Sequence, residues 1–296
     1  PALLGTQFDV VSYKGQNQIR VGGHVLRTTA SRIENARTIE LPGSSKKVIV
    51  WNERTGKTVE AFQAISRDGK AWQKVGPAGN MLKLRYREFD PVKSQPVIPE
   101  EMKAGPATQL HIVQFHTKPL TEYHQAIKEL GGEVFTFLAD TALIVKFPEG
   151  ARNRVAALPF VRWVGQYEPA YKTDPELINL IANGMLPPSR YHIQLSDWTG
   201  ESKSSVANSL RILGADVNAP EGGSFLFATL NAAQIRQMLA WDDVFWASPV
   251  GEIGEDMSIV SAVGGADFLE TLPEAYRGAG VRGEVMDGAF RNTHDD

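Results

Sequence analysis

The residues best suited to chemistry lie near the end of the chain. A glycine turn and a short apolar strand over residues 280–286 lead directly to Asp287. A carboxylate at a strand end can hold a histidine in one tautomer, and that histidine can deprotonate a serine nucleophile. An Asp-Gly pair is also typical of an ordinary turn, so Asp287 alone leaves a purely structural role open.

The residues around Asp287 belong to a wider pattern. Residues 265–270 read Gly-Ala-Asp-Phe-Leu-Glu, residues 276–281 read Tyr-Arg-Gly-Ala-Gly-Val, and His294 and Asp296 follow the acid. From residue 265 on, the chain resembles the opening of the catalytic domain of the subtilisin-like serine peptidases. The resemblance implies that Asp287 is the orienting acid of a Ser-His-Asp triad, with the His and Ser placed after Asp296. The chain by itself is then expected to lack peptidase activity.

The resemblance has departures. The family usually has Ser or Thr and then Gly after the acid, where this chain has Gly288 and Ala289. Glu284 is unusual in a strand that should be buried. His294 matches the histidine of the turn that follows the acid, and not the catalytic base.

The composition is that of a globular protein with more than one domain. The chain has 296 residues, of which 42% are apolar and 22% charged, and a formal net charge of −3. The absence of cysteine excludes disulfides and thiolate chemistry, and no apolar run is long enough for a membrane span. The N-terminal residues show no signal peptide. Basic residues in the first hundred positions are scattered singly, which argues against a nucleic-acid partner.

An internal repeat organises the middle of the chain, because residues 111–169 recur as residues 192–252. At three separate places the offset between the copies is 83. The corresponding pairs are Leu130 and Leu213, Thr141 and Ser224, and Val161 and Val244. His111 and His192 are offset by 81, which predicts that they begin equivalent strands.

Each copy is predicted to have the order strand, helix, strand, strand, helix, strand. In the first copy the strands are expected at residues 110–115, 134–138, 142–147 and 161–164, with helices at 120–130 and 151–158. The helices of the second copy are indicated by Val206, Leu210, Leu213, Ala232, Ile235 and Leu239. The order predicts an α+β fold with tandem ferredoxin-like (βαββαβ) repeats. In each, the helices cover one face of an antiparallel sheet and the other face is free.

Tandem ferredoxin-like repeats before a subtilisin-like segment resemble the pro-regions of that family, although one such domain is usual. The resemblance implies that the free sheet face covers the chain's own peptidase domain, in cis or in trans. It also implies that a tail lies in the substrate cleft and is cleaved between Gly254 and Gly264. The tail residues expected to enter the cleft are Gly254, Met257, Ile259, Val260, Val263 and Gly264.

Short alternating segments predict a β-rich region over residues 1–105, ending in a Pro-rich linker at 90–105. Its expected strands are 8–13, 19–26, 47–51, 58–65 and 81–89. The remaining divisions are 106–172 for the first repeat, 173–190 for a linker, 191–254 for the second repeat, and 255–296 for the tail and first catalytic strand. Inward packing is expected for the tryptophans Trp51, Trp72, Trp163 and Trp246.

Two functions from different classes stay open. The first is an intramolecular chaperone and inhibitor of a bacterial subtilisin-like endopeptidase that is secreted or held in the cell envelope. The second is a non-catalytic binding or assembly module in which Asp287 is structural. No cofactor and no metal are expected, since isolated histidines such as His111 and His192 make a poor metal site.

Overall fold

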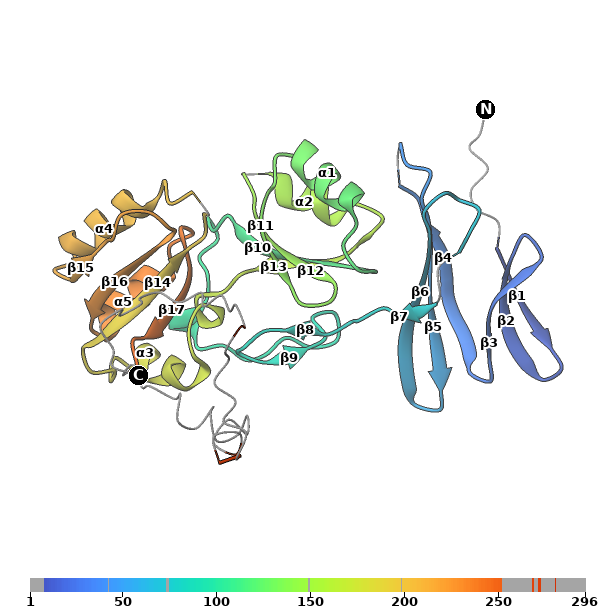
Figure 1. Ribbon diagram of the computed structural model, residues 1–296, viewed down its shortest axis with the longest axis horizontal. Coiled ribbons are helices and arrows are strands. Elements are labelled where there is room, and N and C mark those ends of the chain that lie inside the picture. The colour runs from blue at the N-terminus through green and yellow to red at the C-terminus, as the bar shows by residue number, and fades with distance from the viewer. Residues whose placement is uncertain are drawn as a thin grey trace. The chain divides into compact units, whose positions relative to one another are not determined.

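The computed structural model describes residues 8–41, 43–72, 75–148, 150–197 and 199–251, together with Phe268, Thr271, Leu272 and Gly280. The chain divides into residues 1–250 and residues 251–296. The first part is an α+β structure, built of small antiparallel sheets with few helices (Figure 1).

The N-terminal region is β-rich, as the sequence predicts. Its strands are β1 (Phe8–Tyr13), β2 (Gln16–Val21), β3 (His24–Thr29), β4 (Arg32–Ile39), β5 (Lys47–Thr55), β6 (Thr58–Ser66) and β7 (Gly76–Pro77). The first three form one sheet and the other four a second sheet. The expected strand 19–26 is interrupted by Gly22 and Gly23, which have φ values of +56° and +81°. Trp51 packs inward as expected, 2% exposed and stacked on Phe62, and Trp72 is half-buried against the same cluster.

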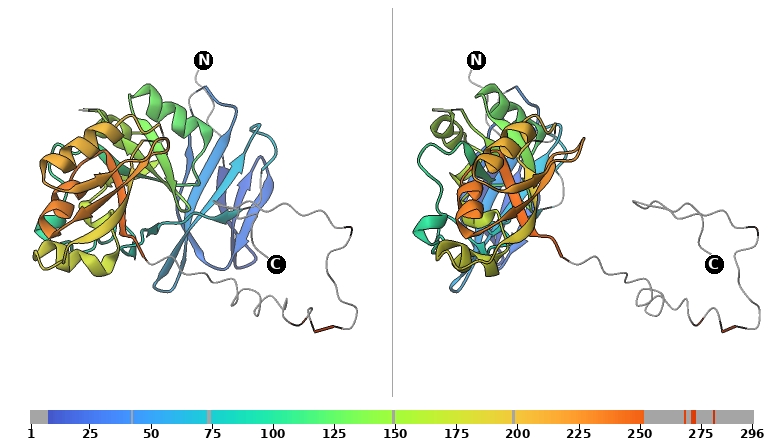
Figure 2. Two further views of the ribbon diagram at one scale, coloured as in Figure 1. Left: turned by 60° about the vertical axis from the view of Figure 1, so that its left-hand side comes forward. Right: turned by 90° about the vertical axis from the view of Figure 1, so that its left-hand side faces the viewer.

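Two modules follow, and they share one strand order. The first module contains β10 (Leu110–Phe115), α1 (Thr121–Glu129), β11 (Glu133–Leu138), β12 (Ala142–Lys146), α2 (Ala151–Ala156) and β13 (Val161–Gln166). The second contains β14 (Ser189–Leu195), α4 (Lys203–Ile212), β15 (Asp216–Asn218), β16 (Phe225–Leu230), α5 (Ala232–Leu239) and β17 (Val244–Pro249). The sheet orders are β11-β12-β10-β13 and β15-β16-β14-β17, with antiparallel neighbours throughout. Figures 1 and 2 show the helices of each module stacked on its sheet.

Local sequence explains where the helices begin and end. Helix α1 buries Tyr123 and Ile127 and is followed by Gly131 at φ +87°. Gly214, at the offset of 83, has φ +80° after α4. Helix α5 begins with a capping box, in which Asn231 accepts from the backbone of Gln234 while the Gln234 side chain accepts from the Asn231 backbone.

The structure does not place His111 and His192 at equivalent positions of their first strands, β10 and β14, as the offset of 81 predicts. Gln114 pairs with Ala142 on one side and Trp163 on the other, and Gln194 pairs with Phe225 and Trp246 in the same way. The offset in this strand is therefore 80, so His192 corresponds to Ile112 and not to His111. Because alternate residues of a strand point to opposite faces, a shift of one residue places the two histidines on opposite sides of their sheets.

Residues 82–102, which we call the arm, are packed against the modules. The expected strand 81–89 is instead a small hairpin of β8 (Leu82–Lys83) and β9 (Glu88–Phe89), followed later by η1 (Glu100–Met102). Leu82, Phe89 and Met102 are buried in the same apolar cluster as the first sheet. Most of the predicted linker 90–105 is therefore structural, because its apolar residues complete a core.

The second predicted linker, 173–190, is also structured. After η2 (Pro169–Tyr171) come η3 (Pro175–Leu177) and α3 (Ile178–Ala182), which contacts α5 and buries Ile178 and Ile181. Thr173 forms a parallel bridge with Ala247 of β17. These residues thus belong to the core of the second module, where the sequence predicted a spacer.

Candidate functional site

The residues that the sequence singles out for function lie outside the described part of the chain. They are Asp287, Gly254, Met257, Ile259, Val260, Val263 and Gly264. Their roles remain predictions. The described candidate site is instead the sheet of the second module, whose last strand immediately precedes the predicted tail.

The first module does not leave a sheet face free. Leu110, Ile112 and Ile144, on the face opposite its helices, are at most 1% exposed and share a cluster with the arm. On the same face, a guanidinium nitrogen of Arg162 lies 2.7 Å from a carboxylate oxygen of Asp90 in the arm. The expectation of a free face is wrong for this module, because a segment before the repeat covers it.

The second module leaves its corresponding face open. Strand β14 presents His192 and Gln194 there, and β16 presents Phe225 and Phe227. These four side chains are half-buried, whereas Ile193 and Leu226, on the helix side, are fully buried. The His192 ring lies 5.2 Å from the Phe225 ring and 5.3 Å from the Phe227 ring, centroid to centroid. The open face therefore carries a contiguous aromatic cluster on its two central strands.

Three cations lie over the aromatic rings of this face. The Arg190 guanidinium is 5.4 Å from the Phe227 ring, and the Lys203 ammonium is 5.8 Å from the Phe225 ring. Arg85, from the arm, lies 5.5 Å from the Trp246 ring and also forms an ion pair with Asp174. Such cation–π contacts hold the cations at the edge of the aromatic surface.

The two equivalent tryptophans occupy different environments. Trp163 lies against Gly165, since a Cβ atom at that glycine would come within 2.0 Å of the indole ring. Ser248 stands at the position corresponding to Gly165 and carries a Cβ atom, and Trp246 lies under Arg85 on the open face. The expected core packing holds for Trp163, which packs against the central cluster. It is wrong for Trp246, which belongs to the open face.

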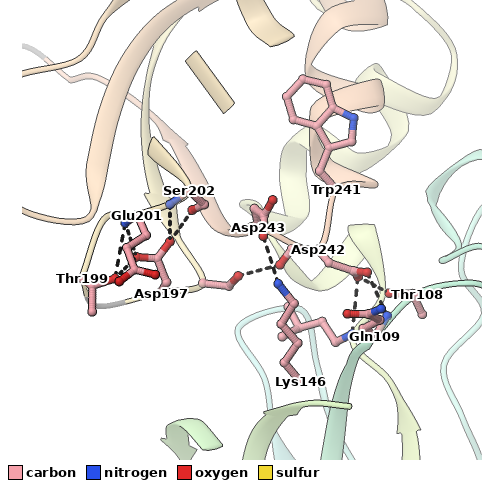
Figure 3. Close-up of polar contacts among 12 residues, drawn as sticks. Thr108, Gln109, Lys146, Asp197, Thr199, Glu201, Ser202, Trp241, Asp242 and Asp243 are labelled. Carbon is pink, nitrogen blue, oxygen red and sulfur yellow. Dashed lines mark hydrogen bonds and ion pairs between the residues drawn. The ribbon is translucent and has the colours of Figure 1, made fainter. Parts of the chain in front are cut away.

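Hydrogen bonds and an ion pair made by Asp242 and Asp243, which we call the Asp242 lock, join the two modules (Figure 3). The Asp242 carboxylate, in the loop before β17, accepts hydrogen bonds from the Thr108 hydroxyl and from the backbone N–H of Gln109 at 2.9 Å. Next to it, the Lys146 ammonium donates to Asp243 at 3.1 Å. In the same view, Asp197 accepts hydrogen bonds from the turn that opens α4, including the Ser202 hydroxyl. The contacts of Asp242 and Asp243 connect the loop before β17 to β12 and to the residues just before β10.

Lys172 is buried beside this lock. It is 1% exposed and donates to the Trp241 carbonyl oxygen at 2.8 Å. Burial lowers the pKa of Lys172 to about 8, against the opposing influence of Asp242, Asp243 and Glu168. Burial of an ammonium group is costly unless it is hydrogen-bonded, and the Trp241 carbonyl oxygen supplies such a partner.

The open face has the chemistry of a protein-contact surface. Aromatic rings with flanking arginines are the side chains that contribute most binding energy at protein interfaces. Among the described residues there is no cluster of three or more His, Cys, Asp or Glu that could hold a metal ion. No helix in that part of the chain is long and apolar enough to cross a membrane.

The sequence itself distinguishes the open face from the covered one. The first copy has apolar residues at positions 110, 112 and 144, which face the arm. The second copy has Arg190, His192 and Phe227 at the corresponding positions. Apolar residues at these positions are typical of a covered sheet face, as in the first copy. Polar and aromatic residues there are typical of an open face, as in the second copy.

Comparison with known proteins gives one partial match. A family model described as Domain of unknown function (DUF8729) matches residues 83–168. The match begins in the arm and continues to just past the end of β13, so it joins the arm to the first module as the packing does. No curated protein and no solved structure matches the chain.

Proposed function

We propose that this chain is the pro-region of a secreted or cell-envelope subtilisin-like serine endopeptidase, with the opening of the catalytic domain attached. Both modules are then ferredoxin-like domains, a view supported by their βαββαβ element order and shared strand order. The segment from residue 265 on supports the peptidase family by its resemblance. The work of the pro-region is to assist folding of the peptidase and to keep it inactive until cleavage.

The observation that carries this proposal is the open face of the second sheet, next to the predicted tail. Val250 donates to the Arg190 carbonyl oxygen at 2.8 Å, so the chain leaves the sheet beside the aromatic cluster. A partner bound to this face would contact the sheet whose last strand leads along the chain into the predicted tail. The predicted tail could then add to the partner's cleft as an extended strand, through main-chain hydrogen bonds.

The two modules have different roles in this proposal. The first, covered by its arm, supports the second through the Asp242 lock, and only the second contacts the peptidase. The α/β catalytic domain is rich in non-local contacts and folds slowly, so a preformed sheet face can stabilise it as it forms.

The test is inhibition of the mature parent peptidase by the separate pro-region. Replacing Phe225 and Phe227 together with alanine should raise the inhibition constant by roughly 30-fold or more, since buried aromatic anchors each contribute about 1–2 kcal/mol or more at an interface. The matched control is Phe137→Ala, because Phe137 is 55% exposed on β11 of the first module. A variant that ends at Val250 tests the tail separately, and it too should inhibit more weakly.

Equal inhibition by the wild type and the double phenylalanine variant would refute the role of the open face. Equal inhibition by the full and tail-less forms would refute cleft binding. A gene without a triad His and Ser after Asp296 would refute the peptidase itself and leave the binding or assembly module.

A further inference from the structure

A separate cavity lies where the second N-terminal sheet meets the first module. Its volume is about 390 Å³, and it is lined by residues of β4, β5 and β6 together with residues of the first module. The polar lining consists of Asn35, Arg37, Asn52, Asn80, His116 and Arg162. Val50 and Phe62 contribute to its apolar wall. The cavity shares no residue with the open face of the second sheet.

An irregularity of β4 brings Arg37 into this cavity. The pairing of β4 with β5 passes from Glu34 opposite Asn52 to Arg37 opposite Val50, so two residues on β4 face one on β5. Asn35, within this bulge, has a left-handed φ of +53°. Bulges redirect side chains next to binding sites, and a non-glycine residue in this region carries a conformational cost.

Of the two arginines that line the cavity, only one forms an ion pair among the described residues. Arg162 is paired with Asp90, whereas none of the ion pairs of the described residues contains Arg37. Arg37 instead lies with a guanidinium nitrogen 2.6 Å from His116 Nε2, which must accept because an arginine can only donate. Burial, and then Arg37 and Arg162, lower the pKa of His116 to about 4. At neutral pH the cavity thus has the positive charge of Arg37 and a neutral imidazole.

Further hydrogen-bond donors line the same space. Within the described part of the chain, the side-chain amides of Asn35, Asn52 and Asn80 make no hydrogen bond. An arginine that faces a histidine, with amide donors around it, matches the needs of a carboxylate or phosphate group.

We propose that this cavity binds a small oxyanion, a carboxylate or a phosphate group, through the guanidinium of Arg37 and the surrounding amides. The bound anion would compensate Arg37 and replace the His116 ring as the acceptor of its hydrogen bond, so that His116 can be protonated and become a second charged donor. Since its lining comes from both the N-terminal sheet and the first module, the anion would also fasten these two elements together.

The experiment is an NMR titration of the whole chain with inorganic phosphate and, separately, with acetate, at constant ionic strength. At least one anion should shift the imidazole signals of His116 saturably and raise the pKa of His116 by about one unit or more. Binding by phosphate alone would identify a tetrahedral anion, and binding by acetate alone a carboxylate. Either result supports the site.

Arg37→Gln should weaken this binding by at least about tenfold, since a charge-assisted hydrogen bond to an anion is lost. The matched control is Arg32→Gln, because Arg32 lies on the same strand, is 80% exposed and does not line the cavity. The proposal is overturned if neither anion affects His116 at concentrations up to roughly 50 mM. It is also overturned if the Arg32 variant weakens binding as much as the Arg37 variant. Neither result would bear on peptidase inhibition, which depends on the open face.

Discussion

Removing the Arg162 side chain should release the arm from the first sheet. Arg162 and Asp90 are 11% and 5% exposed, and the same guanidinium donates to the fully buried Gln114 at 2.6 Å. Arg162→Ala would leave both acceptors without this donor. Lys93, 3.8 Å from the second carboxylate oxygen of Asp90, is 69% exposed and compensates little. Breaking one side of a buried ion pair costs about 3–5 kcal/mol, which is the loss of unfolding free energy expected here.

The assay combines urea unfolding, followed by circular dichroism, with limited trypsin digestion. The variant should unfold at lower urea and be cut faster after Lys93 and Lys103, since the arm then opens more often. Arg54→Ala is the matched control, because Arg54 forms a comparable but exposed pair with Glu34 and should cost less than about 1 kcal/mol.

A double variant tests whether the cost comes from the unpaired charge that Arg162→Ala leaves behind. Replacing Arg162 with Met and Asp90 with Leu together removes both charges, so it should destabilise less than Arg162→Ala alone. The reasoning is refuted if Arg162→Ala costs no more than the Arg54 control and trypsin cleavage is unchanged. It is also refuted if the double replacement costs more than the single one.

Three further predictions concern the modules. Because the folded-state pKa of Lys172, about 8, lies below its ordinary value of 10.5, the unfolded chain binds more protons between these values. Lys172 should therefore contribute a rise of roughly 2 kcal/mol in unfolding free energy from about pH 8 to pH 10, opposed by the buried tyrosines whose pKa values burial raises. The contribution is measured as the difference between wild type and Lys172→Met in pH-dependent urea titrations. Asp242→Ala should lower the unfolding free energy by about 1–3 kcal/mol in urea titrations, because it removes the charged acceptor of the Thr108 hydroxyl and the Gln109 backbone N–H. A cost below about 0.5 kcal/mol would contradict the lock. Gly132→Ala should lower the melting temperature, since the new Cβ would lie 2.6 Å from Ile127, while Gly76→Ala, with open space around it, should not.

Local patterns in the sequence were sufficient to predict the elements of the modules. The offset of 83 predicted that both would have the same order of strands and helices, because periodicity and glycine caps depend on residues close in the chain. Both sheets have one strand order, and glycines end the first helix in each module. The sequence predicts a β-rich N-terminal region, but its alternating segments do not include β4 and do not separate the two strands of the arm's hairpin.

The residues chosen from the sequence for peptidase chemistry remain predictions. Asp287 and the tail from Gly254 to Gly264 rest on a resemblance, and they lie outside the described residues. The candidate site that the structure adds is assembled from β14, β16 and β17 together with Arg85 of the arm. Its members are far apart along the chain, so no local motif joins them.

The sequence by itself determined the β-rich start, the repeat and the kind of element at most positions, since these depend on local spacing. Only the tertiary structure decided which sheet face is open. The arm precedes the first repeat and buries Leu82 and Met102 against one sheet, while the second sheet keeps His192 and Phe227 on its open face. Covering a face depends on contacts between segments distant in the chain. The side on which a histidine lies depends on a strand register that a one-residue error reverses.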